Sequence, residues 1–298
     1  MDDFSTMWLY KNEAYVRPKG KKSLEKIEVP AGLYDDIKEF GNNKIAFKYK
    51  AFGEPCRVET VHSVNGVLFV IRKLMHEIKK MDGLGVRVDL INKLMQANLS
   101  GLVVFAGLQG VGKTTLASSL LVERINTFGG SAQVIEDPPE LDLDGVYTKG
   151  IISQIDVHEI NYADIRHNEE LGYYASRALR ADTDIVYIGE ILRSSEAKEV
   201  VTHSGNGALI ITTIHSGSVS LALERLINLA GDDSEKMLSN TITAVIYVSR
   251  KVYRDKPVLV LDPLFFEDAA ARVALREKNF NILENISKTQ IAGSIMGK

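Results

Sequence analysis

The segment of residues 107–114, Gly-Leu-Gln-Gly-Val-Gly-Lys-Thr, constrains this 298-residue chain more than any other. It matches the pattern GxxxxGK[ST], in which glycines let successive backbone N–H groups point at phosphate oxygens. The apolar run Gly101–Gly107 precedes it, and an apolar-striped segment, residues 113–126, follows it. A buried strand, a glycine loop and a helix in this order predict a P-loop, and therefore an α/β fold that binds a nucleotide.

The chemistry of this loop assigns a role to each of its parts. We expect Lys113 to neutralise the β and γ phosphates of ATP and the Thr114 hydroxyl to bind Mg²⁺. The helix that starts after the glycines adds its positive N-terminal end. The predicted ATP-binding residues are Gly107, Gln109, Gly110, Val111, Gly112, Lys113, Thr114 and Thr115.

Strands and helices alternate after the loop, which indicates βαβ units and a mostly parallel sheet. The sequence predicts strands at residues 131–135, 184–188 and 208–213, and helices at 89–98, 113–126, 168–180 and 218–230. Strands at 244–253 and 258–266 flank a turn at 254–257 and predict a hairpin. A helix over residues 269–286 is expected to close the chain.

Residues 1–85 read as a separate small α+β domain in front of a domain of residues 86–298. Strand-like stretches within residues 58–70 flank an Asn65-Gly66 turn, which predicts a hairpin. Apolar residues at spacings of three to four predict a helix over residues 68–80. The polar, glycine-rich residues 79–85 are the expected linker.

Acidic residues follow two of the predicted strands. Glu136, Asp137 and Glu140 come after residues 131–135, and Glu190 comes after residues 184–188. Ligands bind at the carboxyl ends of strands in open α/β sheets, so these acids are candidates to hold magnesium and to polarise a water molecule. His215 ends the next strand, where a polar residue can sense the γ-phosphate or simply be a satisfied histidine.

Composition argues against several classes of protein. A net charge of −3 and a pI of about 6.1 show no basic excess of the kind that nucleic-acid binding needs, so no direct nucleic-acid contact is expected. The single cysteine, Cys56, cannot form a disulfide framework or a four-cysteine zinc module. No apolar run reaches the length of a transmembrane segment, and a cytoplasmic location fits best.

Four segments in order, GLQGVGKTT, VIEDPPE, ALRADTDIVYIGE and GALIITTIHS, resemble the type II/type IV secretion ATPase family. They look like its P-loop, Asp box, Walker B segment and His box, over roughly residues 55–285. The likeness is strongest to pilus-retraction motors and to the ATPases of type IVB secretion and plasmid thin pili. The resemblance implies a RecA-like ATPase domain that assembles into a hexameric ring and works on an inner-membrane platform protein, held at that membrane through partners.

The resemblance also implies roles for single residues. Glu140 would activate water, with Glu136 as the fallback, and Asp137 and Glu190 would serve the metal. His215 matches the second histidine of the His box. Arginines would complete the site from an adjacent subunit, and the candidates are Arg57, Arg72, Arg177 and Arg180.

Two departures from the family pattern keep other functions open. Ala208 stands where the family carries a histidine, and Arg193 comes one place late after Walker B. A nucleotide-gated assembly adaptor with negligible hydrolysis would tolerate both changes. A conjugative DNA-transfer motor is the other alternative, which the slightly acidic charge balance disfavours. The lack of a four-cysteine zinc module favours a retraction-type, type IVB or plasmid-pilus motor.

Overall fold

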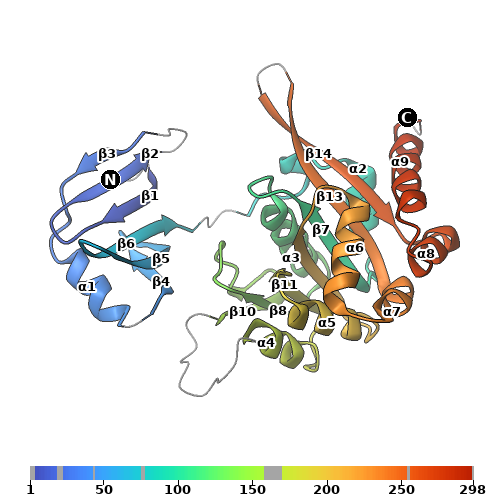
Figure 1. Cartoon of the computed structure of the whole chain (residues 1–298), viewed down its shortest axis with the longest axis horizontal. Helices are drawn as coiled ribbons and strands as arrows, with labels where there is room; N and C mark the ends of the chain where they lie inside the picture. The colour runs from blue at the N-terminus through green and yellow to red at the C-terminus, as the bar shows by residue number, and fades with distance from the viewer. Residues whose placement is uncertain are drawn as a thin grey trace. The chain divides into compact units, whose positions relative to one another are not determined.

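The computed structural model describes residues 4–18, 23–42, 44–74, 78–157, 170–253 and 256–296. Its contacts divide the chain into two compact units, seen in blue and in green to red in Figure 1. The first unit is built on residues 1–76, and the short segment Asp137–Asp142 groups with it. The second unit holds most of the chain from residue 77 on.

The first unit is a six-stranded antiparallel sheet covered on one face by a helix. Its strands, in the spatial order β3-β2-β1-β6-β5-β4, are β1 (Phe4–Leu9), β2 (Ala14–Pro18), β3 (Glu25–Ile27), β4 (Ala46–Ala51), β5 (Glu54–Ser63) and β6 (Gly66–Lys73). Helix α1 (Leu33–Phe40) buries Ile37 against Met7, Phe47 and Ile71, which are fully enclosed.

The hairpin predicted within residues 58–70 is confirmed, because β5 pairs with β6 from Cys56↔Lys73 to Ser63↔Gly66. The helix predicted over residues 68–80 is wrong: residues 66–73 form strand β6, and residues 78–80 are irregular. Strand β6 lies between β1 and β5, so its run of Val, Phe and Ile gains ladder hydrogen bonds on both sides. Residues 75–77 lie outside the described part of the chain.

The second unit is built around an eight-stranded sheet, ordered β14-β13-β7-β12-β11-β8-β10-β9. Five neighbours, β13, β7, β12, β11 and β8, run parallel, as predicted. The strands are β7 (Gly101–Gly107), β8 (Gly130–Glu136), β9 (Gly145–Val146), β10 (Gly150–Asp156), β11 (Ile185–Glu190), β12 (Leu209–His215), β13 (Ile242–Tyr253) and β14 (Lys256–Phe265). The predicted C-terminal hairpin is β13–β14, with residues 254–255 of its turn outside the described part.

Helices surround this sheet (Figure 1). They are α2 (Val88–Leu94), α3 (Lys113–Phe128), α4 (Glu170–Ala178), α5 (Ser194–His203), α6 (Val219–Ala230), α7 (Ser234–Thr241), α8 (Ala269–Arg276) and α9 (Phe280–Met296), with a 3₁₀ turn η1 (Asp82–Leu84). Helix α3 contacts β7, β8, β11 and β12, so the segment after the P-loop is anchored on the centre of the sheet.

The single C-terminal helix predicted over residues 269–286 is wrong, because two helices, α8 and α9, share that region. Lys278 adopts a φ of 56°, which ends α8. The backbone N–H of Asn279 donates to the Ala274 carbonyl, and its side chain accepts from the N–H of Ile282 at the start of α9. Asn279 therefore acts as the cap of a new helix, a role that asparagine favours.

Candidate functional site

The predicted P-loop follows strand β7 directly and runs into helix α3 at Lys113. Gly107, Gly110 and Gly112 have φ values of 156°, 75° and 109°, which glycine adopts without steric cost. A Cβ on Gly107 would lie 2.4 Å from the Val248 carbonyl oxygen of β13, whereas a Cβ on Gly110 would project into open space. The loop is thus packed tightly at its base and open at its crest.

Lys113 is only 7% exposed, and its ammonium contacts the loop. The Nζ atom donates to the Leu108 carbonyl at 3.0 Å and lies 3.4 Å from Nδ1 of His215. The neighbouring strand explains the second contact, because His215 at the end of β12 is in register with Gly107 at the end of β7.

Glu190 lies on the other side of His215. Its Oε1 is 3.0 Å from His215 Nε2, an ion-pair distance when the imidazole is protonated. Strand β11 delivers Glu190 opposite Thr213 of β12, and the Thr213 hydroxyl donates to the Gly189 carbonyl at 2.8 Å. The carboxyl ends of three parallel strands, β7, β12 and β11, therefore bring Lys113, His215 and Glu190 into one row, the edge at which open α/β sheets bind ligands.

Glu136, at the end of β8, is 4% exposed. It accepts a hydrogen bond of 2.7 Å from Nε2 of Gln154 on β10, and a Cβ on Gly189 would lie 2.9 Å from its Cγ. Gln154 in turn accepts from the Leu143 N–H. Sequence reasoning missed Gln154, because β10 has no clear alternation of apolar and polar residues, and only the fold brings Gln154 to the Asp box.

The other predicted acids and arginines lie elsewhere. Asp137 and Glu140 are exposed and follow β8 in the segment Asp137–Asp142. Arg57 and Arg72 are direct cross-strand partners on β5 and β6 of the first unit. Arg177 and Arg180 are exposed at the end of α4, and Arg177 lies 5.8 Å from the Tyr173 ring.

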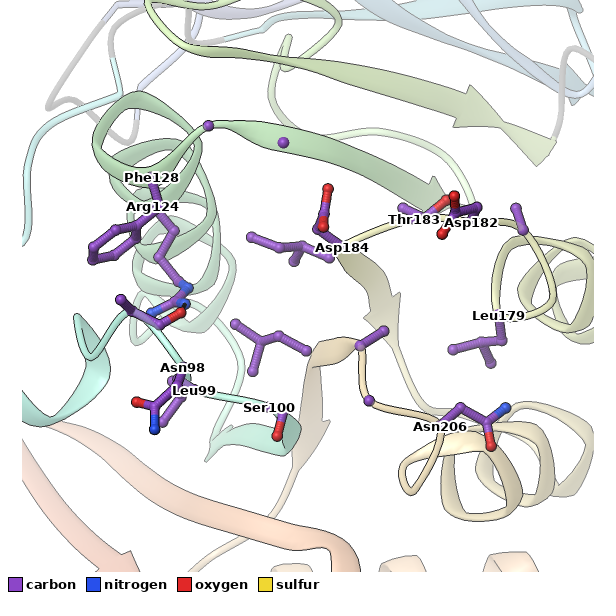
Figure 2. Close-up of a pocket in the computed structure, with 18 residues that line it drawn as sticks. Asn98, Leu99, Ser100, Arg124, Phe128, Leu179, Asp182, Thr183, Asp184 and Asn206 are labelled. Carbon is purple, nitrogen blue, oxygen red and sulfur yellow. Dashed lines mark hydrogen bonds between the residues drawn. The ribbon is translucent and has the colours of Figure 1, made fainter.

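A cavity of about 540 Å³ lies at the amino ends of the central strands (Figure 2), whereas the P-loop follows the carboxyl end of β7. It is lined by residues at the amino ends of the central strands, among them Asp184, Ala208 and Ser100. Its buried cation, Arg124, donates to the carbonyls of Leu94, Gln96 and Ala97 after helix α2. Burial lowers the pKa of the Arg124 guanidinium. Arg124 therefore compensates the C-terminal end of α2, a structural role.

A protein-family model described as "Type II/IV secretion system protein" matches residues 42–258. The chain belongs to this family. The matched residues include all four segments that resemble the P-loop, Asp box, Walker B segment and His box. The family predicted from those segments is therefore confirmed.

Curated relatives include ATPases of type IV pili and a protein of type II secretion. The chain is 26% identical over 237 residues to the "Type IV pilus retractation ATPase PilT" of Pseudomonas aeruginosa, covering 75% of this chain and 65% of that protein. It is 29% identical over 221 residues to the "Type IV pilus assembly ATPase PilB" of Thermus thermophilus, covering 70% and 23%. A "Putative type II secretion system protein E" of Escherichia coli is 27% identical, covering 64% and 36%. The chain thus spans less than two thirds of each of these relatives.

Solved structures share the fold. The pilus retraction motor PilT with bound ADP has a TM-score of 0.78 at 20% identity, covering 96% of this chain and 86% of that one. The ATPase DotB of Legionella pneumophila has a TM-score of 0.75 at 19% identity, covering 97% and 84%. The second unit is therefore RecA-like and is preceded by a small domain, as predicted. No helix among the described residues is long and apolar enough to cross a bilayer.

The site's residues suit Mg²⁺ and a nucleotide. Mg²⁺ binds through few protein oxygens together with phosphate oxygens and water. The half-buried Thr114 lies in the first turn of α3, and Glu190 is 30% exposed at the next strand end but one. The open crest at Gly110 leaves room for the phosphates. The protein thus offers one hydroxyl and one carboxylate to a metal that a bound nucleotide would share.

Proposed function

We propose that this chain is a Mg-ATP hydrolase that works as a subunit of a hexameric motor in a type IV pilus or type IV secretion machine. The observation that carries the proposal is the row formed by Lys113, His215 and Glu190 beside an open glycine loop. At a P-loop, the cation can bind phosphate, the histidine can sense the γ-phosphate, and the carboxylate can bind a metal ion.

Each residue of this row would act on a stated part of the nucleotide. Lys113 would leave the Leu108 carbonyl and His215 to bind the β and γ phosphates. Thr114, with Glu190 and Asp137, would serve the Mg²⁺ ion, which neutralises charge on the phosphates. Glu140 would orient and polarise the attacking water, with Glu136 as the fallback. Glu136 is less suited to meet that water, since it is buried and already bonded to Gln154.

The arginines of the first unit support a site that is completed between subunits. Arg57 and Arg72 lie directly opposite each other on adjacent strands, and Lys48, whose ammonium pairs with Asp142, is the next partner in the row. Like charges in direct cross-strand pairs are destabilising, so such a row favours binding an anion. Neither Arg57 nor Arg72 has an ion pair within the described residues. We propose that they, or Arg177 and Arg180, stabilise the γ-phosphate of a neighbouring subunit.

In this account ATP binding closes an interface between subunits, and hydrolysis with release opens it. The glycine-containing segment at η1, where Gly85 has a φ of 83°, would absorb the motion between the two units. The work would pass to a platform protein of the inner membrane. The ring would act on the cytoplasmic side of that membrane.

The test is Mg-ATP hydrolysis measured against protein concentration, with Lys113→Ala and Glu140→Gln alongside. Specific activity should rise with concentration as rings assemble, and both variants should lose it. Equal specific activity down to dilutions where the chain is monomeric would contradict a site completed between subunits. Equal inactivity of wild type and Glu140→Gln in fully formed rings would favour the adaptor, which binds ATP without turnover.

A further inference from the structure

Strand β13 runs past the end of its neighbour and reaches the P-loop. Its pairing with β7 ends at Val248↔Gly107, where β7 stops, but β13 continues to Tyr253. Arg250 is two residues beyond Val248, so its side chain leaves the strand on the same face as that of Val248. The twelve-residue strand thus carries a guanidinium to the side of the loop, where a strand that ended with β7 would carry none.

Arg250 contacts the backbone of the loop itself. Its Nε donates a hydrogen bond of 3.0 Å to the carbonyl oxygen of Val111. A Cβ placed on Gly112 would lie 3.5 Å from its Nη2, so the guanidinium packs directly on that glycine. A cavity of about 150 Å³ beside this contact is lined by Arg250 together with Leu84, Thr115 and Leu259.

The peptide that Arg250 contacts is a phosphate-binding peptide of the predicted cradle. The carbonyl of Val111 and the N–H of Gly112 belong to one planar trans unit, in which the two groups point in opposite directions. An arginine that fixes the carbonyl on one side therefore fixes the N–H on the other. In a P-loop the N–H groups of this stretch are the ones that point at phosphate oxygens.

We propose that Arg250 is a positioning residue for the nucleotide: it holds the Val111–Gly112 peptide with its N–H turned into the phosphate cradle. The inference rests on the proposed function, because it assumes that the loop binds phosphate. It adds a residue outside the four boxes, on the C-terminal hairpin, and it couples the placement of that hairpin to the affinity of the loop. Arg250 acts through the loop backbone, so its geometry matters and its charge does not.

Three variants distinguish a role of the Arg250 hydrogen bond from a role of its charge. Arg250→Ala removes the hydrogen bond, and Arg250→Lys keeps the charge and the aliphatic chain but not the Nε donor. Lys251→Ala is the matched control, since Lys251 is the next cation on the same strand and points to the other face. The measurement is equilibrium binding of fluorescent ATP and ADP analogues with Mg²⁺, followed by steady-state hydrolysis. Hydrogen exchange of residues 107–116 without nucleotide reports the loop directly.

Arg250→Ala and Arg250→Lys should each weaken ATP and ADP binding about five- to tenfold, the loss of roughly one hydrogen bond. KM should rise while kcat stays within about twofold, because a ground-state contact is lost equally in the transition state. Exchange at residues 107–116 should quicken in both variants, and Lys251→Ala should match wild type throughout.

Full rescue by Arg250→Lys, or a loss for ATP without one for ADP, would show that charge acts on the γ-phosphate and would overturn the inference. Wild-type affinity in Arg250→Ala would overturn it as well. Among the results of this experiment, only a wild-type chain that binds no nucleotide would overturn the proposed function itself. An unchanged unfolding midpoint of the variants without nucleotide shows that they are folded.

Discussion

Alanine substitutions at two glycines of the P-loop should have different effects on the protein. Gly107 has a φ of 156°, and a Cβ there would lie 2.4 Å from the Val248 oxygen and 3.0 Å from Cγ2 of Val111. Gly110 has a φ of 75°, and a Cβ there would meet nothing within 4 Å. Gly107→Ala should therefore damage the fold, and Gly110→Ala should damage the site.

The structure sets the size of each effect. For Gly107→Ala, overpacking against backbone costs about 1–3 kcal/mol and the strained φ costs about 1–3 kcal/mol more, so unfolding free energy should fall by about 2–6 kcal/mol. For Gly110→Ala, the left-handed backbone costs about 1–2 kcal/mol, and the lower entropy of the unfolded chain offsets about 0.4–1 kcal/mol of this. The net loss is therefore about 0–1.6 kcal/mol.

The assay is urea denaturation without nucleotide, paired with binding of a fluorescent ATP analogue. Far-UV circular dichroism follows both units, whereas the fluorescence of Trp8, the single tryptophan, follows only the first. Gly107→Ala should shift the dichroism transition to lower urea and leave the fluorescence transition in place. Gly110→Ala should unfold near wild type but bind the analogue at least about tenfold more weakly, because its methyl group fills the crest. Equal destabilisation by both variants would refute this reasoning.

Three further outcomes are expected. Arg124→Met should lower the free energy of unfolding by about 2–5 kcal/mol in urea titration, because it leaves the carbonyls of Leu94, Gln96 and Ala97 without their buried donor. Burial raises the pKa of the Cys56 thiol, so Cys56 should resist iodoacetamide at mildly alkaline pH until the first unit unfolds. Quick labelling of the native chain would show that the thiol is not buried. Ala208→His, at the cavity far from the P-loop, should change stability by no more than about 0.5 kcal/mol and leave KM for ATP unchanged.

The sequence was informative wherever pattern and chemistry coincide. The apolar run Gly101–Gly107 is strand β7 over the same residues, because only a strand buried on both faces is apolar throughout. Strand-end residues such as Glu190 and His215 were predictable as neighbours, because parallel strands align their carboxyl ends.

Long-range contacts were the part that the sequence could not provide. Gln154 lies on a strand without a clear alternation, and only the neighbouring pairing of β8 and β10 brings it to Glu136. The contact of Arg250 with the P-loop can be recognised only when the length of β13 beyond the end of β7 is known. The two wrong helices had different causes. In β6 a helical spacing of apolar residues was overridden by sheet pairing, which is a long-range effect. At Asn279 a local helix cap was not recognised.

The most direct test of the central claim mixes two inactive proteins. The double variant Arg57→Ala, Arg72→Ala keeps its own P-loop and Glu140 but cannot complete the site of a neighbour. Glu140→Gln has the opposite defect. If arginines of the first unit act on the adjacent subunit, an equimolar mixture should regain Mg-ATP hydrolysis as mixed rings form, with about a quarter of the interfaces intact by random assembly. A mixture that stays as inactive as its parts, in rings shown to exchange subunits, would contradict a site completed between subunits by Arg57 and Arg72.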